Sequence, residues 1–141
     1  MKKIIAIDVG NSETTVGVGN SKSWEGYRFT TRKTITSDEL LMMFKTIIDL
    51  DPIKENLIEG AIICSVVPQI TNSVATATSR FISKEAIVVG PGVKTGLKVN
   101  IDNPKELGPD RIANSIGGYI KSESAVIVVD LGTATTFDLV N

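Results

Sequence analysis

The 141-residue sequence contains no histidine and a single cysteine, Cys64. Without histidine, a Ser-His-Asp triad, a Cys-His pair and a histidine-ligated metal site are all excluded. A single cysteine excludes a disulfide within the chain and a zinc site built from thiolates. Because Cys64 stands in the apolar run "AIICSVV", we expect it to be an inert core residue. Acid–base chemistry would fall mainly to carboxylates, with lysine or tyrosine as alternatives.

The sequence also lacks a strong charge of either sign and a long hydrophobic run. Its formal net charge of −1 gives no electrostatic reason to expect nucleic acid or a membrane surface as a partner. No apolar stretch has the length of a membrane span. The stretch that follows Lys2 and Lys3 is interrupted at Asp8, too early for the core of a signal peptide. With 42% hydrophobic residues, we expect a compact cytoplasmic protein with a real core.

Hydrophobic periodicity predicts an α/β domain with a mixed sheet. The predicted strands cover residues 4–9, 14–19, 24–31, 59–67, 86–89 and 124–131. The first three are short and joined by tight turns, as in an antiparallel meander. The fourth is nearly all apolar, as in a strand that is covered on both faces. A new strand pair begins with the last of these strands.

Three helices are predicted to alternate with the later strands. The first begins at a capping box of Thr36 and Glu39 and is closed by Pro52. The second opens at Pro68, and the third covers residues 110–121 after an irregular loop rich in glycine and proline. The apolar positions expected to face the core are Leu40, Leu41, Phe44, Ile47 and Ile48 in the first helix and Ile70, Val74, Ala77 and Phe81 in the second.

One pattern occurs twice, 122 residues apart, in "IDVGNSETTVGV" and "VDLGTATTFDLV". In each copy an apolar run ends in an aspartate, Asp8 or Asp130, and a glycine, Gly10 or Gly132, follows after one residue. A buried aspartate is costly unless it is paired or bound to a cation. Glycine lets the backbone approach a ligand closely, and the turn's N–H groups and hydroxyls can bind phosphate oxygens. Either copy alone is explained by an ordinary hairpin; two matching copies favour paired phosphate-binding hairpins.

A third element, "NPKELGPDRIANSIGGY", lies between the two copies. Gly108 and Pro109 interrupt the chain before a helix that opens with Asp110 and Arg111. The helix dipole favours the ionised form of a carboxylate at this end, which is the form that a general base needs. Arg111 offers a planar fork of donors to a carboxylate or an amide. A simple capping role for Asp110 is the local alternative.

Together, "DVGNS", "NPKELGPDR" and "DLGTATTFD" resemble the motifs of type III pantothenate kinases, within the superfamily of acetate kinase, sugar kinases, Hsp70 and actin. The segment "TRKTITSDEL" is also similar. The resemblance spans the chain and implies a ribonuclease-H-like (actin-like ATPase) domain, a mixed five-stranded sheet with flanking helices, over residues 1–122. Residues 123–141 would then be the first hairpin of an incomplete second domain. The implied reaction transfers the γ-phosphoryl group of ATP to pantothenate, the first step of coenzyme A biosynthesis.

The resemblance also implies roles for individual residues. Asp110 would be the general base that takes the proton from the primary hydroxyl of pantothenate. The first phosphate-binding loop would consist of Asp8, Val9, Gly10, Asn11, Ser12, Glu13, Thr14 and Thr15. Further contacts would come from Gly132 and Thr133 to ATP and from Ile101, Gly108, Pro109, Asp110 and Arg111 to pantothenate. Asp130 would bind a monovalent cation, K⁺ or NH₄⁺, with Asp8 as the second metal-site residue, and Mg²⁺ would accompany the nucleotide.

The sequence departs from the family pattern at two residues and in length. Pro109 stands where alanine is common, and Ile101 where many members have tyrosine. Family members are nearly twice as long, and the strand pair over residues 124–141 is marginal by itself, with free edges that invite association. We therefore expect activity from the complete enzyme, whose remaining half could come from another chain, and little or no turnover from this chain alone.

Family members are usually dimers, so the resemblance also implies a homodimer. Ile112, Ile116 and Ile120 would then lie near the subunit contact, or else face the core, and their spacing does not decide between the two. Two other functions stay open. One is a non-catalytic binding or regulatory module derived from this family. The other is a sugar or acetate kinase, against which the "GPDR" element and its upstream "DNP" argue.

Overall fold

The computed structural model describes residues 2–50, 57–90 and 93–141. The chain forms two compact units, residues 1–89 and 90–141. The two predicted domains, 1–122 and 123–141, divide the chain at a different residue. They refer to the architecture of the longer family members, and that division stays a prediction.

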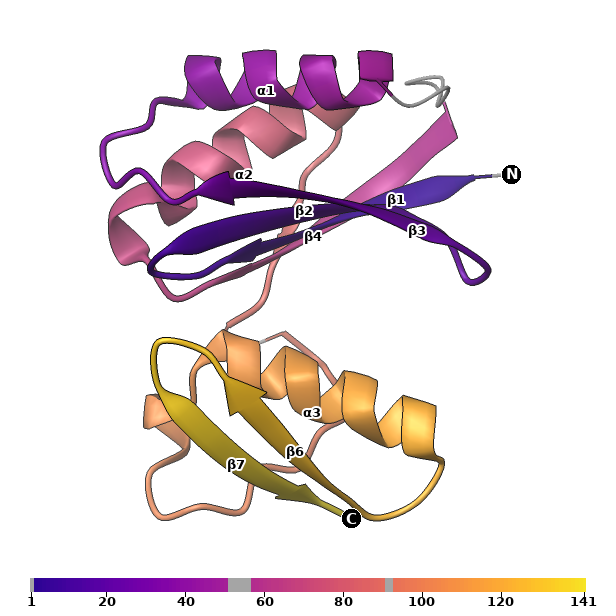
Figure 1. Cartoon of the computed structure of the whole chain (residues 1–141), viewed down its shortest axis with the longest axis vertical. Helices are drawn as coiled ribbons and strands as arrows, with labels where there is room; N and C mark the ends of the chain where they lie inside the picture. The colour runs from indigo at the N-terminus through magenta and orange to yellow at the C-terminus, as the bar shows by residue number, and fades with distance from the viewer. Residues whose placement is uncertain (1, 51–56, 91–92) are drawn as a thin grey trace. The chain divides into compact units, whose positions relative to one another are not determined.

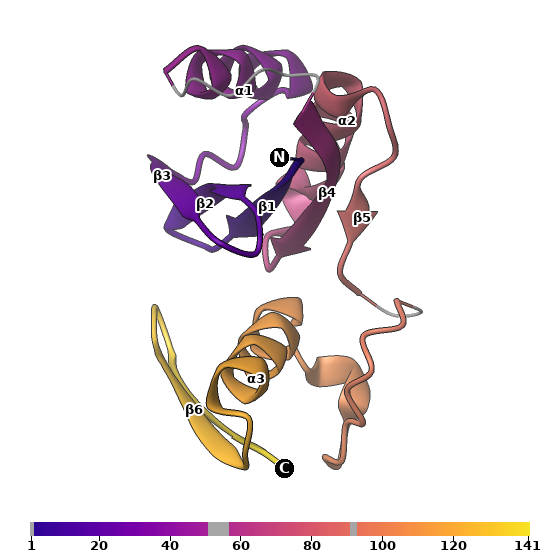
Figure 2. The same ribbon diagram turned by 90° about the vertical axis from the view of Figure 1, so that its right-hand side faces the viewer.

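The first unit is built on a mixed five-stranded sheet with the strand order β3-β2-β1-β4-β5 (Figures 1 and 2). Its strands are β1 (Lys3–Val9), β2 (Glu13–Gly19), β3 (Trp24–Thr30), β4 (Ile58–Ser65) and β5 (Ile87–Val88). The first three form the predicted antiparallel meander, whereas β4 is parallel to β1 and β5 is parallel to β4. The sheet confirms the predicted ribonuclease-H-like class, although β5 is shorter than expected.

Two helices, α1 (Ser37–Leu50) and α2 (Pro68–Ile82), lie together on one face of this sheet (Figure 1). The predicted capping box begins α1: the Glu39 N–H donates to Thr36 Oγ1 at 3.2 Å, and the Thr36 N–H donates to Glu39 Oε2 at 2.9 Å. Pro68 starts α2 at a position where a missing N–H breaks no helical hydrogen bond. Pro52, predicted to close the first helix, lies outside the described residues.

The core of the first unit lies between the helices and the sheet. Of the nine predicted apolar helix positions, all are buried except Leu41, which is partly buried. Phe44 of α1 and Phe81 of α2 meet with ring centroids 6.0 Å apart. Cys64 is also buried, as expected.

The opposite face of the sheet is more open. Ile4 of β1 and Ile62 of β4 are 38% and 37% exposed, whereas their neighbours Ile5 and Ile63 are buried. The prediction that the fourth strand is covered on both faces is therefore wrong for the described residues. Both helices of this unit pack on one side, and on the other side of β4 Ile62 is exposed although Cys64 is buried.

The second unit contains a helix and a hairpin. A short 3₁₀ helix, η2 (Pro104–Glu106), precedes α3 (Pro109–Ser122), which packs against a hairpin of β6 (Val126–Leu131) and β7 (Thr135–Val140) (Figure 2). The loop before η2 has no regular structure over residues 93–103, as predicted, and its residues 91–92 lie outside the described part. A Cβ atom on Gly118 would come within 2.7 Å of Val128 Cγ2, so a glycine lets α3 lie close to β6.

The hairpin has two unlike faces, as expected from the period of two in a strand. One face carries Asp130, Asp138 and Val140, which are partly or fully buried in the second unit. The other face is apolar, and its exposed side chains, between 47% and 81% accessible, are Ile127, Val129, Leu131, Phe137 and Leu139. Among the described helices of the chain, none combines the length and the apolar character needed to cross a membrane.

Candidate active site

Asp8 lies near the end of β1, opposite Thr15 on β2. Successive residues of a strand point to opposite faces, and the neighbours Ile7 and Val9 are buried under the helices. The exposed Asp8 side chain therefore lies on the face away from α1 and α2. The first motif thus presents its carboxylate on the open side of the sheet.

The connection after Asp8 is tight. Four residues, Gly10 to Glu13, join the last paired residues of β1 and β2, Val9 and Thr14. The Gly10 N–H donates to the Glu13 carbonyl at 2.9 Å, and a Cβ atom on Gly10 would lie within 2.9 Å of the same oxygen. Close approach of the backbone therefore requires the glycine at this position.

Thr31, which directly follows β3, holds this connection at three points. Its N–H donates to the Ser12 carbonyl at 2.9 Å. Its hydroxyl donates to the Gly10 carbonyl at 2.7 Å and lies 2.8 Å from the hydroxyl of Thr14. Sequence reasoning did not single out Thr31, although Thr31 is the first residue of "TRKTITSDEL", the further segment that resembles the family.

The second aspartate turn differs from the first by one residue. Asp130 lies opposite Thr136, and only three residues, 132–134, join the paired residues Leu131 and Thr135. By the sequence alignment Thr136 corresponds to Thr14, yet in the first hairpin Asp8 lies opposite Thr15. A shift of one residue reverses which face each following side chain occupies. The two copies are therefore alike in sequence but not in register.

The glycine of the second turn is also less constrained. The Gly132 N–H donates to the Ala134 carbonyl at 3.2 Å. A Cβ atom there would lie 3.5 Å from Asp130 Oδ1, which is an ordinary contact. Of the two turns, only the first therefore needs glycine because a side chain would be too close to its neighbours.

The N-terminus of α3 carries the predicted base. Gly108 occupies the N-cap position with extended backbone, and Pro109 is the first helical residue. The N–H that proline lacks is one that the helix does not use at this position. Asp110 therefore lies in the first turn and not at the N-cap, and the Arg111 N–H donates to its Oδ1 at 2.8 Å. A Cβ atom on Gly108 would collide with Asp110 Oδ1, so this glycine makes room for the carboxylate.

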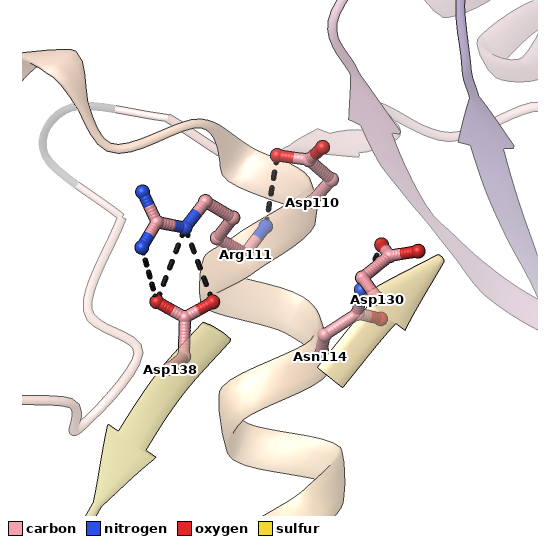
Figure 3. A network of polar contacts seen from close by, with 5 residues as sticks. All are labelled: Asp110, Arg111, Asn114, Asp130 and Asp138. Atoms are coloured by element: carbon pink, nitrogen blue, oxygen red, sulfur yellow. Dashed lines mark hydrogen bonds and ion pairs between the residues drawn. The ribbon is translucent and has the colours of Figure 1, made fainter. Parts of the chain in front are cut away.

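Arg111 forms an ion pair with Asp138 of β7 (Figure 3). Its Nε lies 3.1 Å from both carboxylate oxygens, and its Nη2 donates to Oδ1 at 2.5 Å. The two side chains are 32% and 13% exposed. The hydrogen bond to Asp138 raises the pKa of Arg111, with smaller attractions from the charges of Asp138 and Asp110, while burial opposes the shift. The guanidinium is therefore a fixed charge that joins the helix to the hairpin.

Asn114 makes the second link between α3 and the hairpin. Its Nδ2 donates to Asp130 Oδ2 at 2.9 Å (Figure 3). Asn114 follows Asp110 by four residues, which places both on one side of the helix. The second unit thus brings together the predicted Asp110, Arg111 and Asp130 with two residues that sequence reasoning missed.

Each missed residue had a weak signal in the sequence. Asp138 ends the quoted motif "DLGTATTFD", and Asn114 stands one turn beyond Asp110. Neither signal identifies a partner, because the pairing depends on the register of the hairpin.

An open groove of about 950 Å³ lies in the second unit. Of the predicted pantothenate contacts, Ile101 and Arg111 line it, together with Asp138. Gly108, Pro109 and Asp110 are not among its described lining residues.

Cation ligands are few. Over residues 2–50, 57–90 and 93–141, no group of three or more Asp, Glu, Cys or His side chains could hold a metal ion. The predicted cation residue Asp130 still offers carboxylate oxygen, which is the ligand type that hard cations prefer. A cation bound there would need further oxygen ligands from the nucleotide, the backbone or water.

Two solved structures are similar to this chain over most of its length or over part of it. The Ppx/GppA family member from Aquifex aeolicus is 16% identical, with a TM-score of 0.45 over 98% of this chain and 47% of that protein. YeaZ from Pseudomonas aeruginosa is 13% identical, with a TM-score of 0.44 over 63% of this chain and 43% of that protein.

Sequence comparison gives a closer relationship. A type III pantothenate kinase from Geotalea daltonii is 42% identical over 139 residues, which are 98% of this chain and 54% of the relative. One from Listeria welshimeri is 44% identical over 135 residues, which are 95% of this chain and 52% of the relative. The chain thus spans about half the length of the curated relatives that it matches. The sequence model of the family matches residues 4–141, and the chain therefore belongs to the type III pantothenate kinase family.

Proposed function

We propose that the chain carries the nucleotide- and substrate-binding motifs of a cytoplasmic enzyme that phosphorylates pantothenate to 4'-phosphopantothenate with ATP. The family match over residues 4–141 is the observation that carries this proposal. The activity is proposed for the complete protein, since the relatives are about twice as long as the matched segment. Phosphoryl transfer depends mainly on positioning and charge neutralisation, which suits a chain without histidine.

Asp110 is the proposed general base. Its Oδ1 accepts the Arg111 N–H, which holds the carboxylate in one orientation and leaves Oδ2 for the proton of the substrate hydroxyl. The carboxylate lies in the first turn of α3, at the positive end of the helix dipole. A positioned base of this kind typically contributes a factor of about 10² to 10⁴ to the rate.

The proposed pantothenate site consists of Ile101, Gly108, Pro109, Asp110 and Arg111. Arg111 would bind the substrate carboxylate or amide. The ion pair uses its Nε and one Nη2 hydrogen, so the Nη1 group is the part of the fork proposed to face the substrate. Support for this comes from the groove that Ile101 and Arg111 both line.

The proposed nucleotide site uses the two aspartate turns. Residues 8–15 would form the first phosphate-binding loop, and Gly132 and Thr133 would contact ATP from the second. Mg²⁺ would accompany the nucleotide and neutralise phosphate charge. Asp130, oriented by Asn114, would bind K⁺ or NH₄⁺, with Asp8 as the second carboxylate.

The exposed apolar face of the hairpin is a candidate contact surface for the remaining half of the family's polypeptide. Five large apolar side chains lie on this face, and apolar patches of this kind mark interaction sites. We propose that the complementary half, in the same or another chain, covers it. A homodimer is also proposed, with the exposed Ile120 of α3 near the subunit contact.

A complementation assay tests the proposed function. The chain is co-expressed with the part of the Geotalea daltonii relative that lies beyond the matched segment, and pantothenate-dependent release of ADP is measured. We expect turnover from the pair, little from either part alone, and loss in Asp110→Asn. Absence of both turnover and magnesium-dependent ATP binding in every combination would favour the non-catalytic module. Phosphorylation of a sugar or acetate in place of pantothenate would favour the other kinases.

A further inference from the structure

The direction of two hydrogen bonds in the first connection follows from counting protons. The Thr31 hydroxyl has one hydrogen and donates it to the Gly10 carbonyl oxygen at 2.7 Å. A carbonyl oxygen has no proton, so the direction of this bond is fixed. In the 2.8 Å contact between the two threonine hydroxyls, Thr14 must therefore be the donor. The single hydroxyl proton of Thr14 is then used inside the protein.

The side on which Thr14 lies agrees with this count. Thr14 is 8% exposed and lies opposite Val9 on the face covered by the helices. Thr15 lies on the other face, directly opposite Asp8. Of the two adjacent threonines, only Thr15 shares a side of the sheet with the aspartate.

Thr31 also orients the peptide groups of the connection. Its hydroxyl donates to the Gly10 carbonyl, and its N–H donates to the Ser12 carbonyl. The described chain has no cis peptide bonds, and in a trans peptide the carbonyl and the next N–H point in opposite directions. The N–H groups of Asn11 and Glu13 are therefore held pointing away from Thr31. Two carbonyls that would repel a phosphate are thus turned towards Thr31, and the two N–H groups on the other side of these peptides are the kind of donor that binds phosphate oxygens.

We propose that Thr31 is a positioning residue for the first phosphate-binding loop. Together with Thr14 it forms a hydroxyl clamp, defined by these two residues, that fixes the loop before the nucleotide arrives. Thr14 acts through this clamp and does not donate to a phosphate. The inference rests on the proposed nucleotide site and assigns different tasks to residues within it.

The test compares Thr31→Val, which keeps the shape without the hydroxyl, with Thr31→Ser, which keeps the hydroxyl. MgATP binding to the chain is measured by calorimetry, and amide hydrogen exchange of residues 10–13 by NMR. In the complemented enzyme, KM is measured for ATP and for pantothenate. We expect Thr31→Val to weaken MgATP binding and to raise the KM for ATP about tenfold, a change of about 1.4 kcal/mol. The KM for pantothenate stays unchanged, loop exchange accelerates, and Thr31→Ser restores wild-type values.

Thr14→Val in the Thr31→Val background separates the clamp from a phosphate ligand. If Thr14 acts only through the clamp, this second change adds no further loss, because its partner is already gone. A further tenfold loss of MgATP affinity would overturn the assignment of Thr14. Wild-type MgATP affinity and wild-type loop exchange in Thr31→Val would overturn the positioning role.

The exchange measurement needs neither ATP nor activity. If the unmodified chain and the complemented enzyme both fail to bind MgATP, the proposed function fails, and loop exchange still decides whether the clamp orders the loop. Urea unfolding of each variant reports folding, and Thr31→Ala takes the place of the valine variant if that one does not fold.

Discussion

Arg111 and Asp138, 27 residues apart in the sequence, form a two-pronged ion pair that joins the start of α3 to β7. The hydrogen bond to Asp138 raises the Arg111 pKa, and the guanidinium is charged at neutral pH. The pair lies beside the proposed base Asp110. It therefore links the geometry of the active-site helix to a hairpin that follows it in sequence.

Removing the Asp138 charge should loosen this link. In Asp138→Asn the partly buried Arg111 loses its counter-ion, and a hydrogen bond to a charged group typically contributes about 1.5–3 kcal/mol. We expect a loss of stability of about 2 kcal/mol in urea unfolding, together with faster amide exchange in α3.

Asp38→Asn is the matched control, since it also removes the acidic partner of an arginine. The Asp38 side chain is 78% exposed in its pair with Arg80, and exposed pairs contribute little. Equal effects of the two substitutions would contradict the structural role assigned to Asp138.

Replacing either of two adjacent glycines of α3 by alanine should change the stability in different ways. At Gly117 a Cβ atom would meet nothing within 4 Å, whereas at Gly118 it would approach Val128 Cγ2 to 2.7 Å. Gly117→Ala should stabilise the helix by about 1 kcal/mol, the difference in helix propensity. Gly118→Ala should give no such gain and should weaken the packing of α3 on β6. Thermal unfolding of the pair measures both, and a similar gain in both variants would contradict the close approach.

The capping box of α1 predicts a pH dependence of stability. The hydrogen bonds from Thr36 lower the pKa of Glu39 below the ordinary value of 4.5. A carboxylate with a lowered folded pKa stabilises the protein above its unfolded pKa and loses that contribution as the pH falls through the folded value. Glu39→Gln removes the titrating group, so the difference from wild type should be present at pH 7 and fade below about pH 4. Urea unfolding across this range checks it, and a difference that grows in acid would show that the sign is wrong.

Gly108 is predicted to matter through Asp110. Because a Cβ atom at Gly108 would collide with Asp110 Oδ1, Gly108→Ala should displace the carboxylate and lower kcat in the complemented enzyme. The loss should lie below the factor of about 10² to 10⁴ expected for removing the base itself. Gly117→Ala, on the same helix, should leave kcat unchanged. Unaltered kcat in Gly108→Ala would argue against the assigned base or its orientation.

Local sequence signals predicted most of the elements of the fold. The capping residues Thr36 and Glu39, the proline that starts α2 and the period of the apolar positions act over a few residues, so they can be recognised without coordinates. The two-sided cover expected for the fourth strand was wrong because a run of apolar residues does not say how many layers pack on it.

The sequence by itself determined the family, the positions of the three motifs and the helix that presents Asp110, because these depend on the order and type of neighbouring residues. The tertiary structure alone decided how the side chains pair. The second hairpin has a connection one residue shorter than the first, and this register turns Asp130 and Asp138 towards Asn114 and Arg111. Thr31 likewise reaches Gly10 across 21 residues of sequence. Such contacts are set by strand register and helix packing, which short-range patterns do not encode.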